Sequence, residues 1–384
     1  MTKKINIIQF LPYFPPHKGG VETVGQEIGK YWCKKEYGSF INVVFDVGQE
    51  NKSNYELDGY KVHLLPSFDI IANFPFPKFW KKQFWVILKE LKELQADFVF
   101  THTRFFLSSF IGGKFATKNS IKWVHIEHGS DYVKLGSKLK SKISYIYDKS
   151  IGNWIFKRAD KLIAISSACK KFILTEFIDR EIGVIYRGLD IELNKEIQIE
   201  NLKNKFDGKI IIGFVGRLLK WKNVDSLVNS YYLLNDNIKD KIQIVIVGDG
   251  EELNNLRQLD INNKIYFTGG KSFKEALLLQ LQFDIHFHTS SPGGGLATTL
   301  LQAMYLGCFI IATPYEGADE VIINGVNGIL IENDSVESIK KGIEVGIENI
   351  VKKSEYSEIN KKIINEKFDW NRNIEKIYEI LNNI

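Results

Sequence analysis

Short runs of apolar, β-branched residues recur along this chain, and a segment with helical spacing follows most of them. The runs include INIIQFL, INVVFDV, DFVFTHT and IKWVHIEHG in the first half, and KIIIGFVGR, IQIVIVGDG, FDIHFHT and CFIIATP in the second. Apolar strands that alternate with helices are typical of parallel sheets covered on both faces. A polar stretch after Asp190 separates the two alternations, so the sequence predicts an α/β protein with two doubly wound, Rossmann-like domains.

The length of 384 residues also suggests two domains, and the composition, 44% apolar and 25% charged, is that of an ordinary globular protein. The three cysteines are far apart and form no C-x-x-C pair, which favours a reducing compartment such as the cytoplasm. The first residues, MTKKINIIQFLPYFPP, resemble a weak signal peptide, but the apolar run is short and broken by Pro12, so it is better interpreted as the first strand. No apolar run approaches the length of a membrane span.

Charge divides unevenly between the two halves. Residues 1–190 contain 29 Lys and Arg against 19 Asp and Glu, a net charge of +10, whereas residues 191–384 have a net charge of −5. A basic domain could bind nucleic acid, an anionic membrane or a phosphorylated substrate. No nucleic-acid-binding motif is present, so we expect no nucleic-acid partner and favour the other two.

The window from Ser290 to Glu320 contains the clearest signal of a ligand site. Three glycines, Gly293, Gly294 and Gly295, lie between two apolar runs and precede a helical segment. Glycines let a ligand approach the backbone, and the N–H groups that begin a helix favour an anion. The N–H groups of Leu296, Ala297 and Thr298 are therefore candidates for binding a phosphate, although a glycine cluster is also ordinary turn chemistry.

The order of residues in this window resembles the nucleotide-sugar site of retaining glycosyltransferases of family 4. Their signature is E-x7-E, followed by A-M, G, a strand and G-x-x-E. Here it aligns on Ala303–Met304, Gly307, Gly317 and Glu320. The alignment also exposes a departure, because the two signature glutamates fall on Gly294 and Gln302.

The resemblance implies the GT-B architecture, in which two Rossmann-like domains face each other across a cleft. Residues 1–190 would bind the acceptor and residues 191–368 the donor, while a helix over about 369–384 returns to the first domain. The implied activity is a retaining, metal-independent transfer of a hexosyl group. The donor would be a UDP- or GDP-linked sugar and the acceptor a lipid-linked or other cell-envelope glycan, and no cofactor is implied.

Two cations follow the first strand of the second domain. Arg217 ends the run GFVGR and Lys222 comes five residues later. Paired cations suit a diphosphate whose negative charge grows as it leaves. The resemblance assigns both to the donor diphosphate, although basic loop residues are often only solvated.

The resemblance also assigns further donor contacts. Gly19 and Gly20 match the family's G-G-x-E loop, and Gly248 matches the G-x-G near the nucleotide base, although both pairs could be simple turns. Gln302 stands where a carboxylate normally binds the ribose, and its amide oxygen can still accept a hydrogen bond. Glu320 matches a glutamate near the donor, or it caps a short helix.

Histidines end two strands of the first domain. His128 aligns with the family histidine that approaches the donor sugar, so we expect it to take part in catalysis. His102 and Arg104, in THTR, are candidates for binding the acceptor, with Arg104 on an acceptor phosphate. The other histidines complete no ligand set, so we expect no metal site.

Aromatic residues and lysines interleave before a predicted amphipathic helix. The side chains that would meet an anionic membrane are Phe79, Trp80, Lys81, Lys82 and Trp85. Equally, the helix could pack on its own sheet with its lysines outward. The membrane interpretation places the protein on the inner face of the cytoplasmic membrane.

Two other functions compete with the transferase. Loss of both signature glutamates, at Gly294 and Gln302, is compatible with a sugar-nucleotide-binding or scaffold protein on a decayed transferase fold. Retention of Arg217, Lys222 and His128 argues against decay. An epimerase or phosphorylase on the same architecture lacks support, because no cofactor-binding lysine context is evident.

Overall fold

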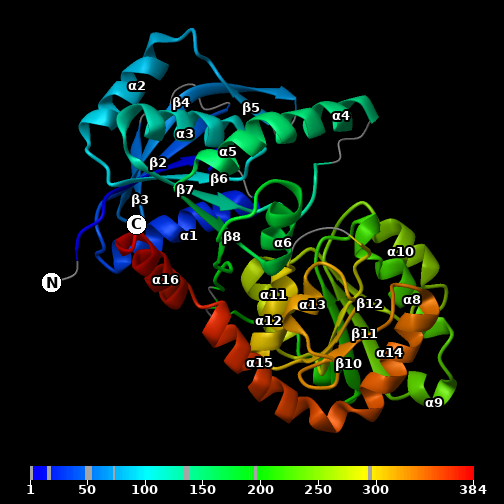
Figure 1. Cartoon of the computed structure of the whole chain (residues 1–384). Coiled ribbons are helices and arrows are strands. Elements are labelled where there is room, and N and C mark those ends of the chain that lie inside the picture. The colour runs from blue at the N-terminus through cyan, green and yellow to red at the C-terminus, as the bar shows by residue number, and fades with distance from the viewer. Residues whose placement is uncertain are drawn as a thin grey trace. The chain divides into compact units, whose positions relative to one another are not determined.

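The structure is a computed structural model that describes residues 3–14, 19–47, 54–71, 74–133, 138–189, 191, 193, 197–292 and 296–384. The chain divides into two compact units (Figure 1). The N-terminal unit consists of Met1–Gly188 together with Trp370–Ile384, and the C-terminal unit consists of Leu189–Asp369.

The N-terminal unit is built on a mostly parallel sheet with the strand order β3-β4-β2-β1-β6-β7-β8-β9. The central strands are buried on both faces, as their apolar sequences require. β3 and β5 pair with β4 in antiparallel fashion, and the other pairs are parallel. The strands are β1 (Ile7–Leu11), β2 (Phe40–Asp46), β3 (Tyr55–Leu57), β4 (Tyr60–Ile71), β5 (Phe74–Pro77), β6 (Phe98–His102), β7 (Lys122–Glu127), β8 (Lys161–Ala164) and β9 (Gly183–Val184).

Helices cover both faces of this sheet. Core residues of α1 and α16 pack on one face, and those of α2, α3, α5 and α6 pack on the other. The helices are α1 (Gly20–Lys34), α2 (Lys82–Glu93), α3 (Leu107–Asn119), α4 (Lys138–Tyr147), α5 (Asn153–Arg158), α6 (Ser167–Glu176) and α16 (Trp370–Asn382).

The last helix, α16, packs against the first, α1. The Trp370 ring stacks on the Tyr31 ring with a centroid distance of 6.0 Å. Ile374, Ile377 and Leu381 follow at helical spacing and are buried in the same core cluster. The C-terminal segment is therefore an integral part of the N-terminal unit.

A π-helical turn, η1 (Asp148–Gly152), joins α4 to α5 without a loop. The extra residue in such a turn changes which side chains face inward, and π-turns are frequent near functional sites. Here the turn contains Asp148, whose side chain is fully buried. The turn therefore carries a charged group into the unit's interior.

The C-terminal unit has a parallel sheet with the strand order β12-β11-β10-β13-β14-β15. The strands are β10 (Ile210–Val215), β11 (Ile242–Val247), β12 (Tyr266–Gly269), β13 (Ile285–His288), β14 (Phe309–Ala312) and β15 (Ile329–Leu330). The helices, including two 3-10 turns, are α7 (Leu202–Lys205), η2 (Lys220–Lys222), α8 (Val224–Tyr232), α9 (Asp236–Lys239), α10 (Leu253–Leu259), α11 (Phe273–Gln280), α12 (Thr298–Leu306), α13 (Ala318–Val321), α14 (Val336–Glu348), η3 (Ile350–Lys352) and α15 (Lys353–Lys367).

The helices of this unit also lie in two layers. Residues of α8, α10 and α14 belong to one core cluster on the sheet, while α11 and α12 contact the same central strands from the opposite side (Figure 1). In both units the strand order reverses direction once, between β1 and β6 and between β10 and β13. Such a switch point leaves an open crevice beyond the carboxyl ends of the two strands, where α/β proteins bind ligands.

Candidate functional site

A chain of hydrogen bonds at the switch point of the N-terminal unit leads to His128. Gln9, in β1, donates through Nε2 to the Gly25 carbonyl over 2.9 Å, and its Oε1 lies 2.7 Å from Nε2 of His102. Nδ1 of His102 lies 3.0 Å from Nε2 of His128, which follows β7. His102 is fully buried, whereas His128 is partly exposed.

The direction of each hydrogen bond follows from the first one. A backbone carbonyl can only accept, so the Gln9 amide nitrogen faces Gly25 and the Gln9 oxygen faces His102. His102 must then donate from Nε2, which leaves its Nδ1 as an acceptor for the N–H at Nε2 of His128. His128 is thereby held as the tautomer whose Nδ1 carries the free lone pair.

Both rings are neutral at pH 7. Burial lowers the pKa of His102 well below its ordinary value, and the neighbouring His128 lowers it further. Burial likewise lowers the pKa of His128 to about 4, and the positive charge of Arg187 contributes to the shift. The pair can therefore donate and accept hydrogen bonds without adding charge to the site.

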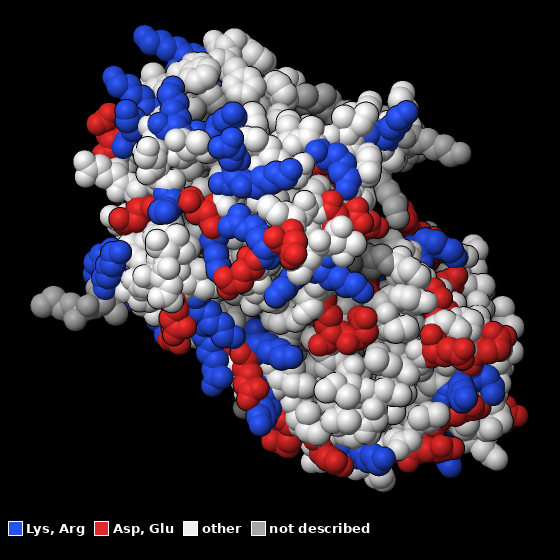
Figure 2. All heavy atoms as spheres, viewed as in Figure 1, with Lys and Arg blue, Asp and Glu red and all other residues white. Residues whose placement is uncertain are grey.

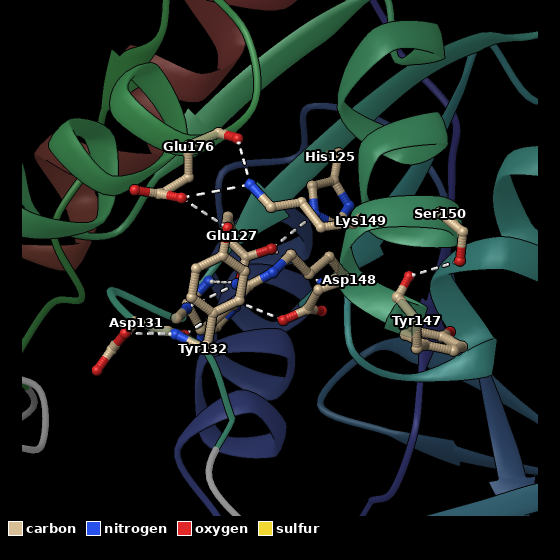
Figure 3. A network of polar contacts seen from close by, with 12 residues as sticks. His125, Glu127, Asp131, Tyr132, Tyr147, Asp148, Lys149, Ser150 and Glu176 are labelled. Carbon is tan, nitrogen blue, oxygen red and sulfur yellow. Dashed lines mark hydrogen bonds and ion pairs between the residues drawn. The ribbon is translucent and has the colours of Figure 1, made fainter. Parts of the chain in front are cut away.

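The Glu127 carboxylate sets the path of the loop that carries His128. It accepts hydrogen bonds from the backbone N–H groups of His128 at 3.0 Å, Gly129 at 2.8 Å and Arg104 at 2.9 Å. His125 lies 3.2 Å from it, as Figure 3 shows. Burial alone would raise the pKa of Glu127, but the Arg104 charge and these hydrogen bonds lower it to about 2.

The Arg104 guanidinium balances this buried charge. Its Nη1 lies 3.1 Å from Glu127, and its Nη2 lies 3.1 Å from Asp148 and 2.9 Å from the Asp131 carbonyl. The side chain is 1% exposed and lies over the Phe172 ring. A second layer of contacts joins Tyr132 and Lys149 to Glu176 above this cluster (Figure 3).

Arg187 is a site residue to which the sequence pattern assigned no role. It follows β9 near the end of the N-terminal unit, and its side chain makes no hydrogen bond or ion pair with the described residues. Burial lowers the pKa of its guanidinium, although Glu27 partly offsets this effect. A partly buried cation without a carboxylate partner beside His128 is suited to an anionic ligand.

The switch point of the C-terminal unit brings together Lys222 and Glu316. The Lys222 ammonium donates to both carboxylate oxygens of Glu316, at 2.9 and 2.7 Å, and the Ser290 hydroxyl donates to one of them. Lys222 is 14% exposed and Glu316 3%. The Glu316 backbone has a φ of 50°, a left-handed conformation that is costly for a residue with a side chain.

Helix α12 begins beside this ion pair. The Ala297 N–H donates to the Glu316 carbonyl over 3.2 Å in this structure, and its role in binding an anion stays a prediction. Leu296 and Thr298 flank it, while Gly293, Gly294 and Gly295 lie outside the described residues. Gln302, in α12, is 5% exposed, and its amide makes no hydrogen bond with the described residues.

Arg217 follows β10 and is exposed, and its guanidinium makes no hydrogen bond or ion pair with the described residues. Gly248 follows β11 and has a φ of 154°, and a Cβ there would meet the Gly216 carbonyl oxygen at 1.9 Å, so only glycine fits. Glu320 lies in α13 and is partly exposed.

In the N-terminal unit Gly19 precedes α1, and a Cβ on it would meet the Glu22 carboxylate at 2.2 Å. A Cβ on Gly20 would meet nothing within 4 Å, so the space beside it is open to a ligand.

Comparisons with known proteins identify the family. The model for Glycosyl transferases group 1 matches residues 195–365, and that for Glycosyltransferase Family 4 matches residues 18–193. An uncharacterized glycosyltransferase of Methanocaldococcus jannaschii is 42% identical over 391 residues, which cover 99% of this chain and 100% of the relative. The chain belongs to glycosyltransferase family 4.

Two further comparisons concern a more distant enzyme and a solved structure. A Campylobacter jejuni N-acetylgalactosamine-N,N'-diacetylbacillosaminyl-diphospho-undecaprenol 4-alpha-N-acetylgalactosaminyltransferase is 24% identical over 55% of this chain and 57% of its own. The crystal structure of Anabaena HepE in complex with UDP superposes with a TM-score of 0.73 at 18% identity, covering 99% of this chain and 100% of HepE. The likeness confirms the predicted α/β fold, so the glycosyltransferase has the GT-B architecture of two Rossmann-like domains.

The structure buries the two residues that the sequence predicted to contact the acceptor. His102 and Arg104 are 0% and 1% exposed, and the hydrogen bonds of their side chains run to Gln9, His128, Glu127 and Asp148. In this structure His102 contacts His128 and Arg104 pairs with Glu127, so both side chains have protein partners. Their roles towards an acceptor stay predictions.

The expected membrane-contacting residues lie at the surface of the glycosyltransferase's N-terminal unit. Phe79, Trp80 and Trp85 are exposed, as are Lys81 and Lys82. Figure 2 shows Lys and Arg gathered over this unit. No described helix is long and apolar enough to cross a membrane, and among the described residues no cluster of His, Cys, Asp or Glu could hold a metal ion.

Replacing Glu127 with glutamine should destabilise the glycosyltransferase. We expect the free energy of unfolding at pH 7 to fall by about 3 kcal/mol, because the buried Arg104 loses a charged partner. The folded-state pKa of Glu127 lies below its ordinary value of 4.5, so its contribution is present above that pH and is lost as the pH falls towards 2. Urea unfolding should show the same difference between wild type and variant at pH 7 and pH 5, and a smaller difference at pH 4.

Glu358→Gln is the matched control, because Glu358 is 75% exposed and pairs only at the surface with Lys361. The free energy of unfolding of this control should fall by less than about 0.5 kcal/mol at each pH. Equal stability of wild type and Glu127→Gln, or a difference that grows on acidification, would contradict the assigned role.

Proposed function

We propose that this glycosyltransferase moves a sugar, with retention of configuration, from a nucleoside diphosphate to a lipid-linked acceptor of the cell envelope. The observation that carries the proposal is a pair of cations at the switch point of the C-terminal sheet. Arg217 follows β10, and Lys222 pairs with Glu316, whose carbonyl accepts the Ala297 N–H at the start of α12. A diphosphate is the donor group that such an arrangement recognises. The UDP complex of Anabaena HepE supports a uridine nucleotide, and a GDP-sugar is the other candidate.

The two cations bind the diphosphate in different ways. Arg217 is exposed and makes no ion pair with the described residues, so its guanidinium can meet phosphate oxygens without breaking any of the contacts described. Lys222 is already neutralised by Glu316 and must share its ammonium between that carboxylate and the donor. Glu316 thus positions Lys222, and Arg217 supplies most of the attraction. Together they stabilise the negative charge of the leaving diphosphate, as a divalent cation does in metal-dependent enzymes, so the proposed reaction needs no metal.

Gln302 is a further proposed donor contact in the C-terminal unit. Its amide is almost buried and makes no hydrogen bond with the described residues, so it can accept one from a ribose hydroxyl. Gly19, Gly20, Gly248, Leu296, Thr298 and Glu320 remain proposed donor contacts, as do Gly294 and Gly295 outside the described residues. Neither Gly294 nor Gln302 supplies the carboxylate of the family signature, so the donor sugar depends on other groups.

The acceptor side of the proposed reaction centres on His128 and Arg187. A neutral His128 can hydrogen-bond a sugar hydroxyl without repelling the carbocation-like centre that develops on the donor sugar. In a same-face displacement the leaving phosphate takes the acceptor proton, so no enzymatic nucleophile is required. Arg187 is placed to contact a phosphate of the acceptor, which suits a diphosphate-linked lipid such as the one named for the Campylobacter relative.

A lipid-linked acceptor requires the enzyme to work at a membrane surface, and we propose the inner face of the cytoplasmic membrane. Helix α4 supports this. Leu139, Ile143 and Ile146 lie at i, i+4 and i+7 and are 70%, 60% and 57% exposed. An apolar stripe on a lysine-bearing helix is suited to the headgroup layer of an anionic membrane. Trp80, 68% exposed before α2, would insert beside Lys81 and Lys82.

A sugar-nucleotide-binding protein without turnover is the second candidate. The absence of both signature acids and the neutralisation of Lys222 by Glu316 favour it. A binding protein would need the donor site. It would not need a neutral His128, or an Arg187 that makes no ion pair with the described residues. The two candidates therefore differ in whether the acceptor side has a function.

Transfer assays separate these candidates. The protein is incubated with UDP- and GDP-linked sugars and with undecaprenyl-diphosphate-linked sugars in vesicles, with EDTA present. We expect nucleotide release coupled to a glycosylated lipid for at least one donor. Donor binding without turnover on any acceptor would support the binding protein, and activity that disappears with EDTA would refute the metal-independent mechanism.

Arg217→Ala should weaken binding of the productive donor about 30- to 100-fold, because it removes a charge-assisted contact to the diphosphate. Isothermal titration of the donor measures this effect. Arg257→Ala is the control, since Arg257 is also exposed but lies on α10 away from β10 and β13. Unchanged donor affinity in Arg217→Ala would contradict the proposed contact between Arg217 and the donor diphosphate.

Membrane attachment predicts a loss of vesicle binding in a Trp80→Ser, Ile143→Ser double variant. Both side chains are exposed, so the fold should persist while co-sedimentation with vesicles of phosphatidylglycerol falls at least fivefold. Ile261→Ser is a matched control, because Ile261 is 75% exposed in the C-terminal unit. Co-sedimentation equal to that of wild type would reject the proposed surface.

A further inference from the structure

An apolar cavity of about 610 Å³ lies between α2 and α3 in the N-terminal unit. Its walls include Phe79, Trp85, Leu88 and Phe110, and buried residues such as Phe115 line its floor. A cavity of this size with mostly aromatic and aliphatic walls is typical of a binding site for an organic ligand. The proposed sugar-transfer chemistry uses none of these residues.

Four lysines line the same cavity: Lys89 and Lys92 from α2, and Lys114 and Lys118 from α3. The spacing within each pair, i,i+3 and i,i+4, places its members on one helix face, so the two pairs converge on the groove between the helices. All four are exposed, and none forms an ion pair with the described residues. Lys114 also lies over the Phe110 and Trp154 rings. No acidic residue lines the cavity.

The charged end of the cavity is the end distant from His128. Helix α2 begins beside Pro66, at the carboxyl edge of the sheet, and leads to the start of β6 at the amino edge. Helix α3 leaves β6 at the carboxyl edge and runs back towards the start of β7. The lysines lie in the second half of each helix, so Lys118 is roughly 16 Å along the axis from Leu107.

The geometry points to a binding site for one acyl chain of an anionic membrane phospholipid. The chain would occupy the aromatic groove, and its phosphate would meet Lys92, Lys114 and Lys118. An anionic headgroup complements a lysine cluster without carboxylates, and a chain of methylene groups complements the walls. Trp85 also lines the groove and is exposed, and tryptophan is the kind of side chain that lies at a membrane interface.

This lipid is distinct from the sugar acceptor. Its phosphate would lie at the amino edge of the sheet, whereas His128 and Arg187 lie beyond the carboxyl ends of the strands. A lipid held in the groove could therefore not present its headgroup for transfer. The site would instead anchor the enzyme to an anionic bilayer, and it does not depend on the donor or acceptor proposed above.

Lysophosphatidylglycerol, used below its critical micelle concentration, tests the site by native mass spectrometry and isothermal titration. We expect one bound lipid per chain. The surface variant Lys92→Glu/Lys114→Glu/Lys118→Glu should bind it at least about tenfold more weakly. Lysophosphatidylcholine should also bind at least about tenfold more weakly, because its headgroup carries no net charge. Glycerol 3-phosphate, which lacks the chain, should not bind detectably.

Lys171→Glu is the matched control, because Lys171 is exposed on α6 and makes no ion pair with the described residues. It should bind the lipid as wild type does. The proposal is overturned if lysophosphatidylglycerol does not bind, which would leave the groove to a protein partner. It is equally overturned if the triple variant binds as wild type does, if the choline lipid binds equally well, or if Lys171→Glu causes an equal loss.

Discussion

The buried Glu127 carboxylate is the group on which the N-terminal half of the site depends. It accepts the backbone N–H groups of His128, Gly129 and Arg104, and thereby joins the loops after β6 and β7 at the sheet's carboxyl edge. An isolated carboxylate in this position would be too costly to bury, so Arg104 must accompany it. The π-helical turn between α4 and α5 then supplies Asp148 as the second partner of Arg104.

The C-terminal unit also contains a nearly buried ion pair, which Lys222 and Glu316 form. This pair lies at the crevice where the donor diphosphate is proposed to bind. Glu316 adopts a left-handed backbone conformation next to the start of α12, and strain of this kind is often retained at functional sites. The strained backbone and the ion pair therefore occur together at the crevice proposed for the donor.

Much of the architecture could be predicted from the sequence because it follows from local patterns. Apolar strands that alternate with helices indicate a doubly wound sheet, and the spacing of Ala303, Gly307 and Gly317 indicates the family. Strand ends also located His128, Arg217 and Lys222 correctly at the edges of their sheets.

A sequence indicates least where long-range pairing decides the contacts of a residue. A sequence shows that Arg104 follows a strand, but not that Glu127 and Asp148 bury it, since those partners are 23 and 44 residues away. The same holds for Glu316, which is 94 residues from Lys222, and for the backbone N–H of Ala297, which Glu316 occupies. The sequence also does not show that the Arg187 side chain makes no ion pair with the described residues.

The anomeric configuration of the product tests the central claim most directly. Transfer from a UDP-α-sugar to the lipid-linked acceptor, followed by proton NMR of the released glycan, reports the configuration of the new linkage. A donor diphosphate held by Arg217 and Lys222, with a neutral His128 and no nucleophile required, predicts an α-linked product. A β-linked product would contradict the same-face displacement and with it the roles proposed for these three residues.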